Sequence, residues 1–133
     1  MVDFYYVIHY IVYRFYRKRK EGSGISMLYA CGLHCFLSFI MIGNIDYFVC
    51  LLLDIPLVMN KVIAIAYIFF WAIFEYIVFY RLDHYKEVFD RYDKLSDSPT
   101  MKLQIRKAKV FNISVLAIDI ILLFIVDYCN QHK

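Results

Sequence analysis

Charged residues are almost absent from two long stretches of this sequence. Residues 25–43 contain no Lys, Arg, Asp or Glu, and residues 62–80 contain only Glu75. Hydrophobic residues make up 62% of the chain, against roughly 45–50% in soluble domains. A helix of nineteen residues is about 28 Å long, close to the ~30 Å hydrocarbon core of a bilayer. The composition therefore excludes an ordinary soluble domain and predicts an integral membrane protein.

Motifs for catalysis and cofactor binding are also missing. The sequence has no glycine-rich phosphate loop, no serine nucleophile elbow and no HExxH zinc motif. Cys31, His34 and Cys35 share a helical face, but no second ligand pair lies at metal-binding spacing. Cys31 and Cys35 lie inside an apolar run, where buried thiols are more usual than disulfides. We therefore expect no catalytic residue, no metal site and no cofactor, and a protein that is not an enzyme.

Hydrophobic runs predict an all-α integral membrane bundle with four transmembrane helices in one domain. The first run is the shortest. Its apolar part covers only ~18 Å as a helix, so it crosses only if Arg14 snorkels and the bilayer thins. The alternative is an aromatic helix that lies in the membrane interface. Residues 45–60 are expected to form an outer connection with a short interfacial or re-entrant helix. The predicted spans are 2–16, 25–43, 62–80 and 110–127.

Charged residues return between the third and fourth spans. Hydrophobic side chains recur there at helical spacing, which indicates an amphipathic helix. Ser98 followed by Pro99 is a typical start of a second helix. We therefore expect residues 81–109 to form a cytoplasmic helical hairpin that extends the last two spans out of the bilayer. Its apolar stripe consists of Leu82, Tyr85, Phe89, Tyr92 and Leu95.

Basic residues are concentrated on one side of this topology. Thirteen of the fifteen Lys and Arg residues lie in the first loop or the hairpin, and only Lys61 and Lys133 lie on the other side. The positive-inside rule therefore places the basic loops in the cytoplasm. The C-terminus is expected outside, and so is the N-terminus if the first segment crosses.

Two basic clusters lie just inside the membrane in this arrangement. Their ordinary roles are to set the topology and to contact anionic lipids. The alternative is a docking face for an anionic ligand such as a nucleotide or oligonucleotide, with nearby tyrosines as stacking surfaces. The clusters consist of Arg17, Lys18, Arg19 and Lys20, and of Arg106, Lys107 and Lys109.

Three ionisable residues, His34, Glu75 and Asp119, lie inside predicted spans. Such residues are costly in a membrane and indicate function by default. His34 and Asp119 share a depth near the middle of their spans, so they could pair within or between subunits. Ser38 lies on the same helical face as His34, and Asn112 lies on that of Asp119. We expect these groups either to fix helix packing through hydrogen bonds or to line and gate an ion path.

The layout resembles a family of small bacterial membrane proteins. The resemblance is to the Hailong-type membrane effectors of antiphage defence, channels controlled by a nucleic-acid oligomer that a partner enzyme makes. It implies an oligomeric channel effector in a bacterial inner membrane. The features that carry it are Tyr13-Arg14-Phe15-Tyr16-Arg17 after the first helix, Asn44-Ile45 after the second, and Phe79-Tyr80-Arg81 with Tyr85-Lys86 after the third.

One copy of this chain is too thin to enclose a pore, so a conducting form is expected to be a homo-oligomer. We therefore expect a homo-oligomeric channel or pore-type effector, gated through its basic cytoplasmic face by an anionic ligand. The alternative is a non-conducting membrane anchor, immunity protein or interaction subunit of a larger complex. Oligomeric state and ion flux distinguish the two.

Overall fold

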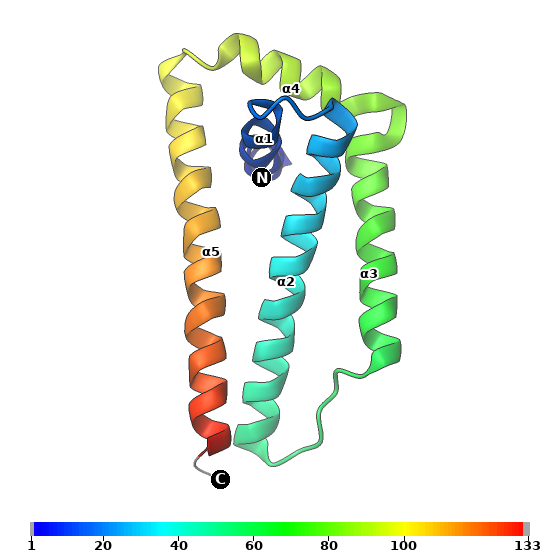
Figure 1. The fold of residues 1–133 in the computed structure, drawn as a ribbon, viewed down its shortest axis with the longest axis vertical. Helices are drawn as coiled ribbons and strands as arrows, with labels where there is room; N and C mark the ends of the chain where they lie inside the picture. The colour runs from blue at the N-terminus through cyan, green and yellow to red at the C-terminus, as the bar shows by residue number, and fades with distance from the viewer. Residues whose placement is uncertain (1, 132–133) are drawn as a thin grey trace.

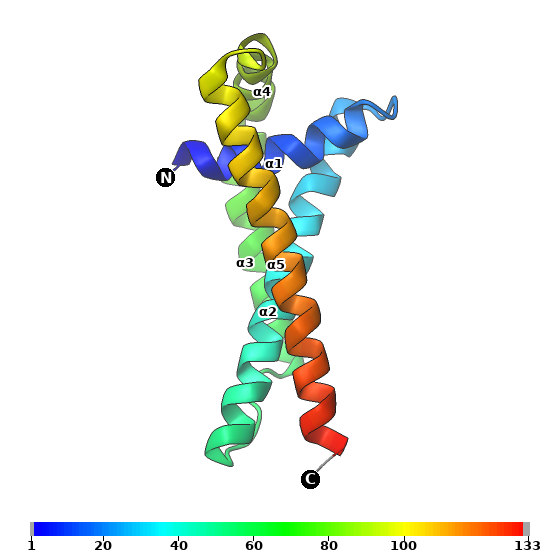
Figure 2. The same cartoon turned by 90° about the vertical axis from the view of Figure 1, so that its left-hand side faces the viewer.

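The computed structural model describes residues 2–131, and within that range it contains helices and turns but no strand. Helices α2 (Ser23–Leu53), α3 (Lys61–Glu75) and α5 (Pro99–Gln131) run along the long axis of the molecule (Figure 1). Two further helices, α1 (Val2–Arg17) and α4 (His84–Leu95), lie across one end of them (Figures 1 and 2). The prediction of an all-α fold is confirmed.

The long helices have the properties expected of membrane spans. The predicted spans 25–43 and 110–127 lie within α2 and α5, whereas the predicted span 62–80 comprises most of α3 and the helical turn that follows it. The apolar stretch that contains this third span joins α3 to the turns and to α4. The stretches that are long and apolar enough to cross a bilayer are Ser23–Leu53, Lys61–Leu95 and Pro99–Gln131.

The first predicted span, 2–16, differs from the other three. Its residues form α1, which has 16 residues and is therefore about 24 Å long. Helix α1 lies crosswise to α2 and α5 instead of along them (Figure 2). Three candidate spans therefore replace the four that were predicted, and the orientation of α1 fits the alternative of a helix in the membrane interface.

Helix α2 is longer than predicted. It runs without a break to Leu53, for 31 residues, so the span 25–43 is too short and the separate short helix expected within 45–60 is wrong. The glycine at the predicted end costs only about 1 kcal/mol inside a helix. The Asp46 carboxylate supports the continued helix, because it accepts the N–H of Met59 in the returning linker at 2.8 Å.

The chain bends sharply where α3 ends. A π-helical turn (Tyr76–Tyr80) and a 3-10 turn (Arg81–Asp83) follow α3. Leu82 and Asp83 have positive φ angles of 59° and 53°, which breaks the helix. As a result α4 crosses the end of the bundle, and the hairpin predicted at 81–109 is wrong in its first half. Leu82, predicted to belong to the apolar stripe, is 93% exposed at this bend.

The helix start predicted at Ser98 and Pro99, in the second half of the hairpin, is confirmed. Helix α5 begins at Pro99, directly after Ser98, whose Oγ accepts the Met101 N–H at 3.2 Å. The helix has 33 residues, or about 50 Å. It is therefore long enough to cross a bilayer and to project from it.

The buried core lies where α1 and α4 cross. Tyr6, Tyr10 and Tyr13 on one face of α1 are buried against aromatic rings of α4 and of the turn before it. Ring centroids are 4.9 Å apart for Tyr13–Phe89 and 5.1 Å apart for Tyr6–Phe79, distances typical of aromatic packing. We call α1 and α4 together the aromatic cap.

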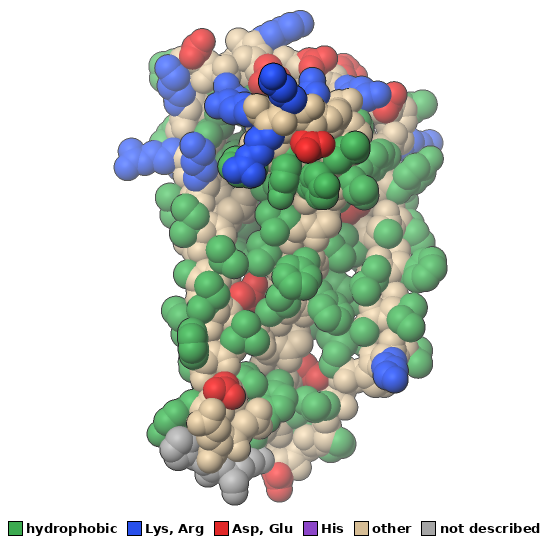
Figure 3. All heavy atoms as spheres, viewed as in Figure 1, with side chains coloured by type: hydrophobic (Ala, Val, Ile, Leu, Met, Phe, Trp, Pro, Cys, Tyr) green, Lys and Arg blue, Asp and Glu red, His purple; other side chains and the backbone are tan. Residues whose placement is uncertain are grey.

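The surface separates into an apolar body and a charged end. Hydrophobic side chains cover the long helices, and Lys and Arg gather around the aromatic cap (Figure 3). Phe70 on α3 and Phe124 on α5 are 71% and 72% exposed, as expected of side chains that face lipid. We call the end that carries the aromatic cap the basic end.

Candidate functional site

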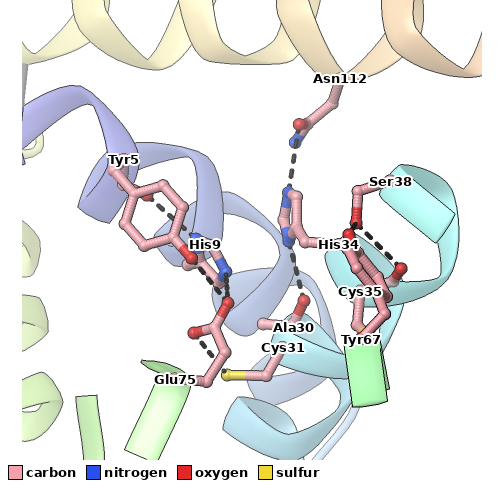
Figure 4. Close-up of polar contacts among 10 residues, drawn as sticks. All are labelled: Tyr5, His9, Ala30, Cys31, His34, Cys35, Ser38, Tyr67, Glu75 and Asn112. Carbon is pink, nitrogen blue, oxygen red and sulfur yellow. Dashed lines mark hydrogen bonds and ion pairs between the residues drawn. The ribbon is translucent and has the colours of Figure 1, made fainter. Parts of the chain in front are cut away.

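Four side chains from three helices meet at the buried face of α1 (Figure 4). Glu75 is central: its Oε1 accepts a hydrogen bond from the Tyr5 hydroxyl at 2.6 Å and lies 3.2 Å from His9 Nε2. Its Oε2 accepts one from the Cys31 thiol at 3.4 Å. His9 and Glu75 are 0% and 3% exposed. We call Tyr5, His9, Cys31 and Glu75 the Glu75 cluster.

The local structure of each helix explains this convergence. Tyr5 and His9 are four residues apart on α1 and therefore lie on one face of it. Cys31 is buried in the first half of α2, which packs against α1. Glu75 ends α3 and directly precedes the π-helical turn. Turns of this kind often occur at functional sites.

Hydrogen bonding fixes the protons of the two α1 residues. A carbonyl oxygen only accepts, so the 3.0 Å contact between His9 Nδ1 and the Tyr5 carbonyl places a proton on Nδ1. His9 Nε2 is then the ring atom that faces Glu75. Burial, and next the hydrogen bond to Glu75, raise the pKa of the Tyr5 hydroxyl far above its usual range. Tyr5 therefore remains a hydrogen-bond donor at neutral pH.

His34 links the Glu75 cluster to α5. Its ring lies against that of His9, with centroids 4.2 Å apart. His34 Nδ1 donates to the Ala30 carbonyl at 2.8 Å, and its Nε2 lies 3.3 Å from Asn112 Oδ1 (Figure 4). Two of the predicted site residues, His34 and Asn112, thus meet directly.

Ser38 takes part in a different contact. Its Oγ lies 2.7 Å from the Tyr67 hydroxyl on α3 and donates to the Cys35 carbonyl at 3.0 Å. Ser38 therefore joins α2 to α3 below the Glu75 cluster, although it was predicted on the face of His34.

Asp119 does not pair with His34, so this predicted contact is wrong within one chain. The two helices run parallel, as the ordered contacts His34–Asn112 and Tyr47–Asn130 show. Asp119 lies seven residues beyond Asn112, about 10 Å further along α5. It is 2% exposed, and neither of its carboxylate oxygens has a hydrogen-bond partner among residues 2–131.

The two predicted basic clusters meet only in part. A hollow of about 180 Å³ between α1 and α5 is lined by Lys18 of the first cluster and Lys109 of the second, together with Arg14 and apolar side chains. Arg17 instead donates to the Glu21 carbonyl at 2.6 Å. Cluster members that do not line this hollow are Arg17, Arg19, Lys20, Arg106 and Lys107.

The structure also brings together possible metal ligands. One ligand atom each of His9, Cys31 and Glu75 lies within 4.8 Å of the other two, and all three residues are buried. His34 and Cys35, which share the helical face of Cys31, are not part of this group in the described portion of the chain.

The sequence interpretation missed Tyr5 and His9. His9 lies within an apolar run, which is the signal that singled out His34, so its titratable ring could have been found in the same way. Its partner could not, because His9 and Glu75 are separated by 66 positions and meet only through the crosswise orientation of α1.

Comparison with known proteins adds no relative, since no family model, no curated protein and no solved structure matches this chain. The resemblance to the Hailong-type effectors stays a prediction. Function is therefore inferred from the fold and from these buried polar groups.

Proposed function

We propose that this chain is a membrane channel that conducts protons along polar side chains buried between its helices. The observation that carries the proposal is Asp119, a carboxylate 2% exposed and unpartnered within residues 2–131, on a helix apolar enough to span a bilayer. Ionisable groups inside membrane spans are rare and typically mark ion or proton pathways.

The other polar groups lie in line with Asp119. The Glu75 cluster lies near the basic end, and His34 and Asn112 follow it toward the middle of α2 and α5. Asn112, Asp119 and Asn130 share one face of α5, because seven- and eleven-residue steps both return to the same side of a helix. Asn112 and Asn130 contact α2, so this face is turned toward α2. We call this series the polar column.

The polar column suits protons better than hydrated ions. Its members nearest the basic end are packed closely, with the rings of His9 and His34 4.2 Å apart. In this proposal, water molecules would carry protons over the ~10 Å between Asn112 and Asp119 along α5, as in the relays of Asp, Glu and His that pass protons in membranes. Because the column lies inside one copy, conduction does not require the homo-oligomer that was expected.

Gating through the basic end is part of this proposal. Helix α1 carries His9 on its buried face and Arg14 near the hollow that Lys18 and Lys109 also line. An anionic group bound in that hollow would pull on α1 and shift His9 relative to Glu75. By the positive-inside rule the basic end would face the cytoplasm. A role in antiviral defence stays a prediction.

The direct test is proton flux into liposomes that contain the purified protein. Asp119→Asn should slow the flux about tenfold or more, equivalent to ~1.4 kcal/mol or more in the barrier. Asp127→Asn is the matched control, because it makes the same change on the same helix at a side chain that already bonds Gln131 at 2.9 Å. Wild-type protein that inserts correctly and passes no protons would instead favour a non-conducting anchor or interaction subunit.

A further inference from the structure

We propose that His9, Cys31 and Glu75 bind a divalent transition-metal ion, with Zn²⁺ the best match. The three side chains offer a ring nitrogen, a thiol sulfur and a carboxylate oxygen, each of which is a donor type that binds zinc in proteins. They come from α1, α2 and α3, so a bound ion would tie the crosswise helix to two of the long helices.

The spacing of the ligand atoms fits tetrahedral coordination. Zinc bonds of about 2.0 Å to nitrogen and oxygen and about 2.3 Å to sulfur put tetrahedral ligands roughly 3.3–3.6 Å apart. His9 Nε2 lies 3.2 Å from Glu75 Oε1, and Cys31 Sγ lies 3.4 Å from Glu75 Oε2. These two separations involve different oxygens of Glu75, and the three ligand atoms all lie within 4.8 Å of one another. Side-chain shifts of roughly 1–1.5 Å would bring them to tetrahedral spacing around one ion.

The surroundings orient the ligands as in known metal sites. His9 donates its Nδ1–H to the Tyr5 carbonyl at 3.0 Å, which directs the other ring nitrogen, Nε2, at Glu75. The Tyr5 hydroxyl donates to Glu75 at 2.6 Å. Metal-bound histidines usually donate their other N–H to a carbonyl or carboxylate, and metal-bound carboxylates are usually hydrogen-bonded in turn. A metal ion between Nε2 and the carboxylate would take the place of the hydrogen bond that now joins these two groups.

One side of the site is open for a fourth ligand. A groove of about 530 Å³ between α2 and α3 is lined by Cys31 and Glu75 and otherwise mainly by apolar side chains. A water molecule at this position would complete four-coordination. Cys35 lines the same groove one turn along α2 but lies outside the ligand group, so it provides a matched control.

Metal binding does not rest on the proposed conduction, although the two would interact. The site occupies the Glu75 cluster, which is the part of the polar column nearest the basic end. An ion held there would block proton transfer between Glu75 and His9 and so close the column. Binding is measured in detergent and conduction in liposomes, so failure of one is distinguishable from failure of the other.

The test is a Co²⁺ titration of the full-length protein in detergent after chelator treatment. Co²⁺ reports thiolate coordination through a charge-transfer band and is displaced by Zn²⁺. We expect one Co²⁺ per chain and a band that Zn²⁺ removes. Cys31→Ser should abolish the band, His9→Gln and Glu75→Gln should weaken binding about tenfold or more, and Cys35→Ser should retain wild-type binding.

Wild-type protein alone also tests the proposal, in case the variants fold poorly. Zn²⁺ should raise its melting temperature, because a ligand that binds only the folded state stabilises it. A folded wild-type protein without a thiolate band would overturn the proposal. So would a band that survives Cys31→Ser or that disappears in Cys35→Ser.

Discussion

Two buried carboxylates in this protein have opposite surroundings. Both oxygens of Glu75 are partnered, by Tyr5, His9 and Cys31, whereas Asp119 has no partner within residues 2–131. An isolated buried charge costs several kcal/mol, so Asp119 needs a proton, water or a group on another copy of the chain as its partner. The proposed proton path requires this carboxylate to gain and lose a proton.

Tyr10 provides a prediction on pH. Its hydroxyl donates to Asp93 Oδ1 at 2.5 Å, and burial, followed by this bond, raises its pKa above the usual value of about 10. The folded state therefore holds the proton more tightly than the unfolded state. This contribution to stability is present at neutral pH and is lost as the pH rises above about 10.

Tyr10→Phe should accordingly have two effects on the melting temperature in detergent. At neutral pH it should lower the stability by about 1 kcal/mol, because one hydrogen bond is lost. Above pH of about 10, the variant should lose less stability than the wild type for each unit of pH. Parallel losses in the two proteins would show that Tyr10 does not carry the effect.

His34, Glu75 and Asp119 could be singled out from the sequence because titratable groups stand out in apolar runs. Their partners could not be predicted. Two partners of Glu75, Tyr5 and His9, are on a helix whose orientation depends on aromatic packing. The side chain that contacts His34 Nε2 is Asn112. A single sequence predicts how deep a residue lies along its own helix, but it does not predict which residues of neighbouring helices face each other.

Helix α2 continues past the residues at which it was expected to end. Gly43 and Asn44 are typical of a helix end, yet α2 continues to Leu53. The linker folds back and bonds to Asp46 through the Met59 N–H, a contact between segments that local sequence patterns do not reveal. The N-terminus of α5, in contrast, follows from Ser98 and was predicted correctly.

Gly43→Ala tests the continuous α2. An added Cβ meets no atom within 4 Å at this position, and alanine is favoured over glycine inside a helix by about 1 kcal/mol. The variant should therefore melt a few degrees higher. Gly22→Ala is the control: it has the same free space but lies at the N-cap, where alanine is disfavoured. A lower melting temperature for Gly43→Ala would indicate that the helix ends there.

The whole molecule consists of an aromatic cap and three long apolar helices. Its main core lies at the basic end, whereas large apolar side chains along α3 and α5 remain exposed. This division explains which parts could be predicted: hydrophobic runs reveal the long helices, but the cap depends on contacts between residues about 70 or more positions apart, such as Tyr6 with Phe79.

Three candidate spans instead of four make a prediction about topology. With α1 crosswise at the basic end, a reporter at the N-terminus should lie on the same side of the membrane as one inserted at Asp97, and a C-terminal reporter should lie on the opposite side. Protease protection in sealed vesicles measures this. If both termini lie on the side opposite Asp97, α1 crosses the membrane and the four-span arrangement is restored.

Proton conduction along the polar column is tested most directly by the reversal potential of the current through the purified protein in a planar bilayer. With opposing gradients of pH and K⁺, a proton path predicts a reversal potential that shifts by about 59 mV for each unit of pH difference. This potential should not depend on the K⁺ gradient. A reversal potential that follows K⁺ would contradict the proposal and indicate a wider, water-filled pore between copies of the chain.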